Sequence, residues 1–323
     1  MSRNCIDELI KLKNIRYHSF SKHLRDTFCS PVYKISIDAG FTCPNRDGYK
    51  GRGGCLYCNE MGSGASYIKR DLSITEQILS GIEQIKKRRN AHKFIAYFQA
   101  FSNTYAPISR LKKLYDEALS INGVVGLSIG TRPDIITDET LDLLEEYSKK
   151  TYFWIEYGLQ SIHDRTLKLI NRCHNYKEFE DTFLKTKKRK IKICVHVIIG
   201  LPGENRTDIL QTAEKLSELK PEGVKIHSLY ISKGSPIEPL YNKGKINLFE
   251  VNEYISIAAD FLERLPKDTI IQRLIGEANR GELIAPKWIL NKTRILSEIN
   301  NELKRRGTYQ GYLFNKSKKF SLI

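Results

Sequence analysis

The alternation of apolar and amphipathic segments between residues 32 and 231 restricts the fold more than any other feature of this sequence. The apolar segments are rich in β-branched and aromatic residues, and the segments between them have helical spacing. Strands that alternate with helices pair in parallel through right-handed crossovers, and ligands then bind at the carboxyl ends of the strands. We predict six strands, over residues 32–41, 93–101, 123–131, 151–159, 192–200 and 223–231.

The number of strand and helix units also limits the architecture. An eight-unit barrel would need more chain, so six units predict an α/β fold that is a partial (β/α)6 barrel or a doubly wound sheet. We expect an N-terminal lead-in over residues 1–31 and the α/β domain over residues 32–235. A small, basic and mainly helical C-terminal extension should follow over residues 236–323, in which residues 269–277 are a candidate for one more short strand.

A glycine-rich loop after the first predicted strand holds three of the seven cysteines. Cys43 is followed, after eleven intervening residues, by Cys55 and Cys58 in a Cys-x-x-Cys turn. Such a turn directs two thiolates to one metal centre, and the glycines allow the backbone to bring Cys43 to it. Structural zinc needs four ligands, whereas a [4Fe-4S] cluster held by three cysteines keeps one iron open for another ligand.

Three other interpretations of these cysteines remain open on the sequence alone. A structural zinc site would need a fourth ligand, for which Cys29 or a histidine such as His23 is available. A thioredoxin-like redox pair at Cys55 and Cys58 would leave Cys43 unexplained. A disulfide framework is disfavoured by the odd number of cysteines and by the length of 323 residues.

The composition is strongly basic. The chain has 53 Lys and Arg against 37 Asp and Glu, a net charge of +16, which favours a polyanion such as nucleic acid as partner. If the basic clusters form one face around the barrel mouth, they should contact phosphates. No apolar run approaches the ~20 residues that a membrane helix needs, and reduced cysteines suit a cytoplasmic protein. The clusters cover residues 86–90, 187–190, 304–306 and 316–319.

Five segments, taken in order, resemble radical S-adenosylmethionine (SAM) enzymes. The set is similar to an uncharacterised bacterial radical-SAM family that is related to the radical-SAM half of the Elongator catalytic subunit. Most of the superfamily spaces its cysteines as Cys-x3-Cys-x2-Cys, and this chain departs from that pattern by a longer first gap. The segments are the cysteine loop and residues 97–107, 130–134, 156–175 and 196–204.

This resemblance implies a cofactor set and ligands for it. Cys43, Cys55 and Cys58 would bind a [4Fe-4S] cluster, and SAM would chelate the open iron through its amino and carboxylate groups. By similarity to oxygen-independent coproporphyrinogen oxidases, Gln160 and Arg172 would hold SAM near its carboxylate. A guanidinium suits that role because it can bind a carboxylate through two N–H groups.

Further SAM contacts follow from the same resemblance. The superfamily usually has Gly-Gly-Glu after the second strand, and this chain has Phe-Gln-Ala there, so Gln99 is the candidate for the SAM amino group. Thr131 is the candidate for the ribose. Ile199 and Gly200 would flank the adenine, although packing in the core is an alternative role for Ile199.

The implied activity is reductive cleavage of SAM to methionine and a 5′-deoxyadenosyl radical, which abstracts hydrogen from a substrate. Relatives are associated with modification of the wobble uridine of tRNA, at a carboxymethylaminomethyl side chain. We therefore expect two partners, tRNA and a reducing electron donor such as flavodoxin or ferredoxin, and no membrane. Two alternatives remain open: a radical SAM enzyme with a small-molecule or protein substrate, and a zinc-stabilised, non-catalytic RNA-binding protein.

Overall fold

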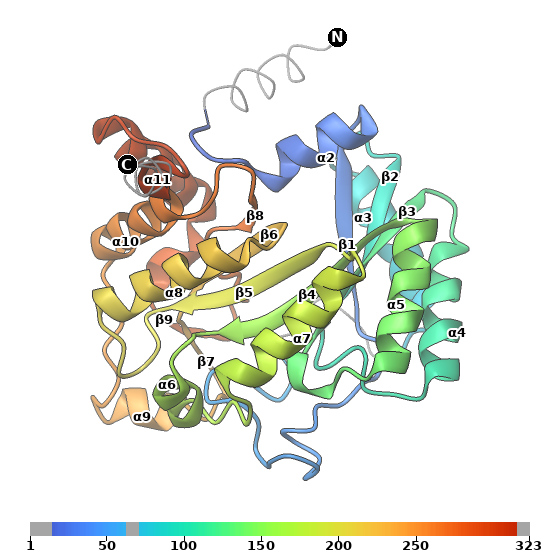
Figure 1. The fold of residues 1–323 in the computed structure, drawn as a ribbon, viewed down its shortest axis with the longest axis horizontal. Coiled ribbons are helices and arrows are strands. Elements are labelled where there is room, and N and C mark those ends of the chain that lie inside the picture. Colours follow the sequence, from blue (N-terminus) through green and yellow to red (C-terminus); the bar gives the residue numbers. More distant parts are fainter. Residues whose placement is uncertain (1–14, 63–70, 315–323) are drawn as a thin grey trace.

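A curled, fully parallel sheet of seven strands forms the centre of the molecule, with helices on its outer face (Figure 1). A computed structural model describes residues 15–62 and 71–314 of the chain. The strand order β1-β2-β3-β4-β5-β6-β8 confirms the predicted partial barrel. The strands are β1 (Val32–Ile37), β2 (Lys93–Phe98), β3 (Val124–Thr131), β4 (Tyr152–Gln160), β5 (Ile193–Ile199), β6 (Gly223–Ser228) and β8 (Ile270–Arg273).

Amphipathic helices connect the strands and pack against the outward side chains of the sheet. Ser73 accepts from the backbone of Glu76, and the Glu76 side chain accepts in return, so the spacing of these residues forms a capping box. Thr137 caps α5, because its side chain accepts from the backbone of Thr140. The connecting helices are α3 (Ile74–Lys86), α4 (Ile108–Leu119), η1 (Pro133–Ile135), α5 (Asp138–Lys150), α6 (Asp164–Leu169), α7 (Tyr176–Lys188) and α8 (Arg206–Leu219).

The sheet has one strand more than the six that the alternation predicts. β8 pairs in parallel with β6, with Ile270 opposite Gly223. It lies in the stretch where residues 269–277 were a candidate for a short strand. Across the barrel interior, Lys34 Nζ of β1 lies 2.9 Å from Gln272 Oε1 of β8, so polar side chains link the two edge strands. The C-terminal part of the chain therefore contributes to the barrel itself.

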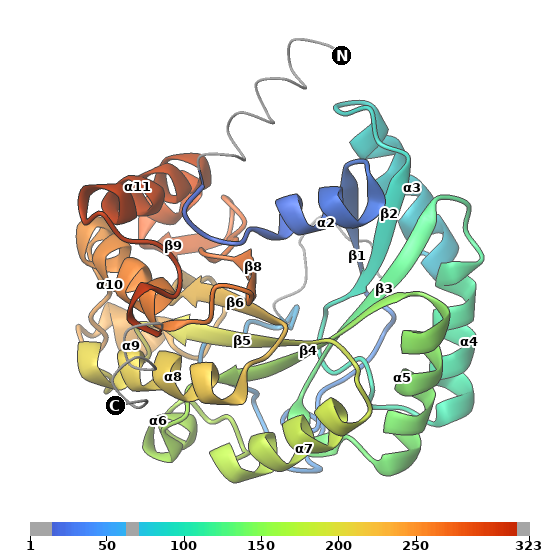
Figure 2. The same ribbon diagram turned by 45° about the horizontal axis from the view of Figure 1, so that its top comes forward.

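Helix α2 (Phe20–Phe28) lies at the amino ends of the strands, where Figure 2 shows it beside β1 and β8. Leu24 is buried against strand side chains such as Ile95, and the ring of Phe20 packs edge-on against Trp154 at 6.0 Å. Helix α2 thus lies within the expected lead-in, residues 1–31. It covers the barrel interior at the end opposite the cysteine loop.

The remaining elements pack beside β6 and β8. α10 contacts both α8 and α11, and β7 pairs with β9 in an antiparallel ribbon. The segment after α11 is tied to the body, since Gln310 donates to Pro266 O and Thr269 O. These elements are β7 (Ile231–Ser232), α9 (Glu238–Asn242), α10 (Val251–Arg264), β9 (Leu283–Ala285), η2 (Lys287–Leu290) and α11 (Lys292–Arg305).

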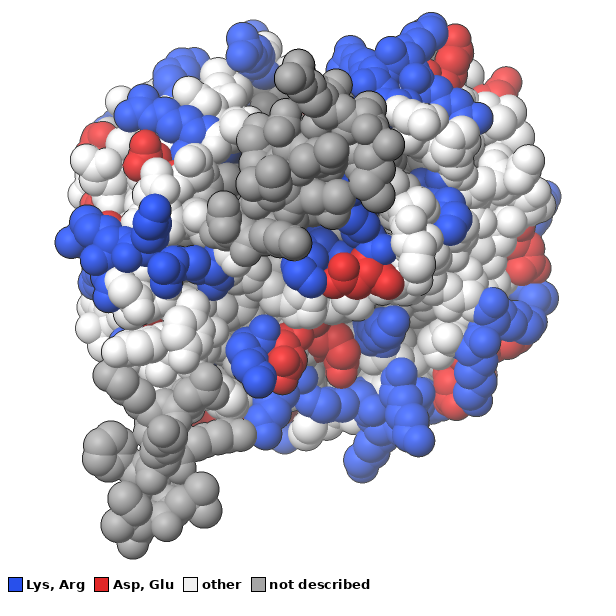
Figure 3. Space-filling model, turned by 90° about the horizontal axis from the view of Figure 1, so that it is seen from above, with Lys and Arg blue, Asp and Glu red and all other residues white. Residues whose placement is uncertain are grey.

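The basic clusters do not surround the carboxyl ends of the strands as expected. Residues 86–90 and 187–190 lie at or after the ends of α3 and α7, and each of these helices leads into the amino end of the next strand. Lys187 caps α8 by donating to backbone carbonyls, among them Lys220 O at 2.8 Å. Figure 3 shows Lys and Arg side chains gathered on the face opposite the cysteine loop. Residues 316–319 lie outside the described residues.

Candidate active site

A cavity of about 190 Å³ opens at the carboxyl ends of the strands. Loops after the strands and inward side chains of the sheet line it, as a parallel barrel requires. Seven of the nine predicted site residues reach this cavity. They are Cys43, Cys55, Cys58, Gln99, Thr131, Gln160 and Arg172.

The cysteine loop has a defined conformation that depends on Arg46. Cys58 N donates to Cys55 O at 3.0 Å, which closes the Cys-x-x-Cys turn. The Arg46 guanidinium donates to Cys58 O at 3.0 Å, and Arg46 N donates to Cys43 O at 2.7 Å. Gly54 has φ +78°, and a Cβ there would lie 2.8 Å from Arg46 Nε. The loop thus needs glycine at this position for Arg46 to join its two halves.

The three loop thiols are not gathered as closely as the ligands of a single zinc ion would be. Tetrahedral zinc with bonds of about 2.3 Å would hold its sulfur ligands roughly 3.8 Å apart. Among the described residues, Glu156, Cys194 and His196 form one set of possible metal ligands whose ligand atoms all lie within 4.8 Å of one another. The three loop cysteines do not form such a set. Glu156 is already bound by two lysines, so we do not interpret it as a metal ligand.

Arg172 contacts a cluster cysteine directly. Its Nη1 lies 3.5 Å from Cys55 Sγ, Nη2 donates to Gly158 O at 2.6 Å, and Nε donates to His174 Nε2 at 2.9 Å. Burial would raise the pKa of the Cys55 thiol, but the charge and hydrogen bond of Arg172, the Arg132 charge and the Tyr57 hydroxyl together lower it. A guanidinium has five N–H groups, so donors remain for a carboxylate such as that of SAM.

Gly158 makes room for the two residues that the resemblance assigned to SAM. A Cβ at this position would lie 2.7 Å from Gln160 Nε2 and 2.8 Å from Arg172 Nη2. Gln160 ends β4 with φ +78°, a conformation that turns the chain out of the strand. The end of β4 therefore places both side chains against one glycine at the edge of the cavity.

Residues of the 130–134 segment support both Arg172 and the cysteine loop. Arg132 forms a bidentate pair with the buried Asp134, at 3.0 Å for both bonds, and donates to Arg172 O at 2.8 Å. Lys50 of the cysteine loop also pairs with Asp134, at 2.7 Å. Burial would raise the pKa of Asp134, but the charge and hydrogen bonds of Arg132, with His174 and Lys50, together lower it to about 2. The Asp134 carboxylate thus connects the loop to the segment that supports Arg172.

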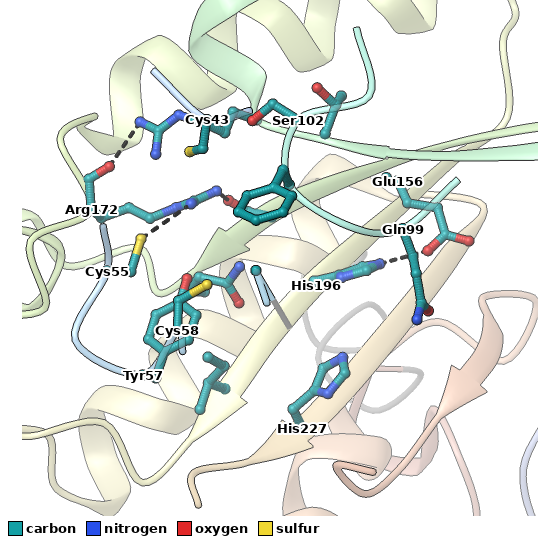
Figure 4. A pocket seen from close by; sticks show the side chains of 18 of the residues that line it. Cys43, Cys55, Tyr57, Cys58, Gln99, Ser102, Glu156, Arg172, His196 and His227 are labelled. Carbon is teal, nitrogen blue, oxygen red and sulfur yellow. Dashed lines mark hydrogen bonds and ion pairs between the residues drawn. The ribbon is translucent and has the colours of Figure 1, made fainter. Parts of the chain in front are cut away.

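Two predicted SAM contacts, Thr131 and Gln99, and one residue that was not predicted, Ser102, line this part of the cavity. Thr131 is buried and exchanges a hydrogen bond of 2.6 Å with Thr104. Gln99 lies on the side of the pocket away from the cysteines in Figure 4, near neither Cys43 nor Cys58. Ser102 lines the same cavity, its backbone N donates to Thr42 O beside Cys43, and its buried Oγ has no partner among the described residues.

The two residues predicted to flank the adenine, Ile199 and Gly200, are not among the residues that line the cavity. Ile199 packs in the core between sheet and helices, whereas Ile198 lines the cavity. Successive side chains of a strand point to opposite faces, so a shift of one residue moves the side chain across the sheet. Gly200, with φ +94°, does not line the cavity either, and the ring of Phe249 lies 3.2 Å from where its Cβ would be.

Inward polar residues of the strands are the feature that sequence reasoning missed. Glu156 is fully buried and binds Lys34 Nζ at 2.6 Å, Lys225 Nζ, Ser128 Oγ, and His196 Nε2 at 2.8 Å. Their signal was an isolated polar residue inside an apolar strand, such as Lys34, Glu156, His196 or Lys225. Such a polar layer replaces the branched apolar residues that usually fill a barrel interior.

A partial parallel barrel with three cysteines and a buried guanidinium at its mouth defines an enzyme that holds an iron–sulfur cluster. The family comparison agrees: the model of the Radical SAM superfamily matches residues 43–216, and that of the Radical_SAM C-terminal domain matches residues 221–305. The chain therefore belongs to the Radical SAM superfamily, and its cofactors are a [4Fe-4S] cluster and SAM. No helix within the described residues is long and apolar enough to span a membrane.

Individual proteins agree with this assignment. The chain is 39% identical over 312 residues to the uncharacterised protein YtqA of Bacillus subtilis, covering 95% of this chain and 96% of YtqA. It is 28% identical over 167 residues to Elongator complex protein 3 of Saccharomyces cerevisiae, covering 49% of this chain and 29% of that protein. Elp3 of the archaeon Methanocaldococcus infernus has the same fold, with TM-score 0.66, 16% identity, and coverage of 86% of this chain and 64% of that one.

Proposed function

We propose that the substrate of this radical SAM enzyme is tRNA, and that it acts on the carboxymethylaminomethyl side chain of the wobble uridine. The match to Elongator complex protein 3 carries the proposal, because the resemblance associates such relatives with this uridine. The net charge of +16 supports a polyanionic substrate. Because the match covers 29% of the Elongator protein, the proposal extends only to the radical SAM part.

The residues of the chain hold and orient the cofactors. When bound, the cluster and SAM supply reductive cleavage of SAM, with an electron from a donor such as flavodoxin or ferredoxin, to methionine and a radical that abstracts hydrogen from the substrate. Cys43, Cys55 and Cys58 would hold the cluster. Arg172 and Gln160 would bind the SAM carboxylate.

Other cavity residues would complete the SAM site. Thr131 would face the ribose, and Ile198, in place of Ile199, would contact the adenine. Ser102 has an unpartnered buried hydroxyl close to the cysteine loop, so it would replace Gln99 as the contact to the SAM amino group. Gln99 would then belong to the substrate half of the cavity.

Exposed residues of the cysteine loop support an RNA substrate. Tyr49 of the cysteine loop is 72% exposed, and its ring lies 6.1 Å from that of Tyr105. Exposed aromatic rings stack on unpaired bases, such as those of an anticodon loop. Arg52 is exposed in the same loop and can reach a phosphate. Tyr49 and Arg52 belong to the loop that carries the three cysteines, whereas the basic clusters at residues 86–90 and 187–190 lie near the amino ends of the strands.

Mass spectrometry of tRNA nucleosides from a deletion strain tests the proposal. We expect carboxymethylaminomethyl uridine to accumulate and to decrease again when the wild-type gene is restored. A gene with Cys58→Ala is the matched control and should not restore the wild-type profile, because the cluster lacks a ligand. An unchanged nucleoside profile in the deletion strain would reject tRNA as substrate and favour a small-molecule or protein substrate.

A further inference from the structure

The cavity has a second half, beyond the cysteines, that the SAM site does not use. Figure 4 shows Cys55, Cys58 and Arg172 on one side of the pocket and His196 and His227 on the other. Residues of β5, β6 and the C-terminal part of the chain line this second half. They are His196, His227, Tyr230, Arg273 and Glu277.

The tautomer of His196 follows from its partners. Its Nε2 lies 2.8 Å from Glu156 Oε2, and Lys225 Nζ binds the same carboxylate, which keeps Glu156 ionised. An ionised carboxylate only accepts, so Nε2 carries the hydrogen. Burial is the main cause that lowers the pKa of His196, to about 4, so the ring is neutral and its Nδ1 has a free lone pair. His196 therefore offers a hydrogen-bond acceptor to this half of the cavity.

Arg273 supplies a positively charged hydrogen-bond donor to the same cavity. It ends β8, the strand beside β6, and it lines the cavity. Its guanidinium pairs with Glu277 Oε2 at 2.9 Å. Burial lowers the pKa of His227 well below its ordinary value, and the Arg273 charge lowers it further, so this imidazole is neutral too. Glu277 also pairs with Lys292. Among the described residues, the cations of this region thus exceed its carboxylates, because Lys34, Lys225, Arg273 and Lys292 outnumber Glu156, Glu277 and Glu282.

We propose that this half of the cavity binds an amino-acid-like group, in which a secondary amine stands one carbon from a carboxylate. Arg273 binds the carboxylate, and His196 Nδ1 accepts the N–H of the amine. The excess of positive charge favours an anion, and a guanidinium binds a carboxylate through two N–H groups. The assignment rests on the proposed function, since a carboxymethylaminomethyl side chain contains such a group, and it makes Arg273 the residue that selects for the carboxylate.

Binding of free nucleosides tests the site without turnover. The reconstituted, SAM-bound enzyme is dialysed to equilibrium against 5-carboxymethylaminomethyluridine or its neutral methyl ester. We expect the wild type to bind the acid about 10- to 100-fold more tightly than the ester, and Arg273→Gln to bind both equally, which is the usual effect of losing a charge-assisted pair. Equal binding of acid and ester by the wild type would overturn the proposal.

The matched control is Arg264→Gln. Arg264 and Arg273 have the same side-chain exposure, 22%, and each pairs with a glutamate, but Arg264 lies on α10 outside the cavity. Arg264→Gln should keep the wild-type preference for the acid. His196→Phe should weaken binding of acid and ester alike, because both contain the amine. A preference for the acid that survives in Arg273→Gln would assign carboxylate recognition to another residue and overturn the proposal.

Measuring turnover distinguishes failure of the carboxylate site from failure of the proposed tRNA substrate. An anticodon stem-loop with the carboxymethylaminomethyl group is incubated with wild type and Arg273→Gln, and KM and kcat are measured. If the stem-loop reacts and Arg273→Gln leaves KM unchanged, the carboxylate site is wrong while tRNA remains the substrate. If the stem-loop does not react but the wild type prefers the acid nucleoside through Arg273, the site stands and the tRNA proposal fails.

Discussion

Replacing Glu156 by Gln tests whether charge pairing holds the barrel interior together. Gln has nearly the same shape, so the change removes the charge and leaves the volume. Glu156 is 0% exposed, and its partners Lys225 and Lys34 are 3% and 18% exposed at their side chains. The variant would leave two ammonium groups inside the barrel without a counter-ion.

The magnitude follows from the burial of the three groups. Removing one partner of a buried ion pair costs about 3 to 5 kcal/mol. Burial is the main cause that lowers the pKa of Lys225, to about 7, and the Glu156 charge raises it in part. Without Glu156 the pKa of Lys225 falls further, so Lys225 loses its proton at neutral pH. Deprotonation of Lys225 limits the loss of stability, and we expect the free energy of unfolding to fall by about 3 kcal/mol.

Urea unfolding of Glu156→Gln, Lys225→Met and the double variant measures this loss. The double variant should lose much less than the sum of the single changes, because Lys225→Met removes the unpaired charge. Between pH 7 and the unfolded pKa of 10.5, the unfolded chain binds more protons at Lys225 than the folded protein does. The free energy of unfolding therefore rises with pH in this window, and in Glu156→Gln the rise begins at lower pH.

The exposed pair of Lys22 and Asp26 is the control, with side-chain exposures of 48% and 59%. Asp26→Asn should change stability by less than about 0.5 kcal/mol. If Glu156→Gln stays within about 1 kcal/mol of the wild type, and the two single changes add, charge pairing does not hold this layer.

Three further predictions concern the cofactors and pH. Cys58→Ala should lower the iron content of reconstituted protein from about four per chain to a small residue; iron uptake equal to the wild type would exclude Cys58 as a ligand. Gly158→Ala should weaken SAM binding about 10-fold or more by calorimetry while keeping the cluster, because its Cβ would lie 2.7 Å from Gln160 Nε2 and 2.8 Å from Arg172 Nη2. The folded pKa of His196, about 4, lies below the unfolded value of 6.5, so the unfolded chain binds more protons in this window and stability falls on acidification. His196→Gln should remove up to about 3 kcal/mol of that loss between pH 6.5 and 4, and an unchanged acid profile in urea unfolding would contradict a buried neutral His196.

Much of the fold was predictable from the sequence, and the loop proposed to hold the cluster was recognisable there too, because local patterns encode both. The alternation of apolar and amphipathic segments depends on residues close in the chain, and it predicted strands within a few residues of β1 to β6. The spacing of Cys43, Cys55 and Cys58 is likewise local. The resemblance supplied Gln160 and Arg172, and both line the cavity.

Tertiary structure decided what depends on the direction of side chains and on distant segments. Ile198 rather than Ile199 faces the cavity because the pleat alternates, and apolar residues on both sides of β5 hide that alternation in the sequence. Glu156 meets Lys34 and Lys225 only when three strands far apart in the chain curl around one interior. Burial and neighbouring charges then shift the pKa values of Glu156 and Lys225 in a way that no local pattern reveals, because electrostatic interactions depend on distance in space and on exclusion of water.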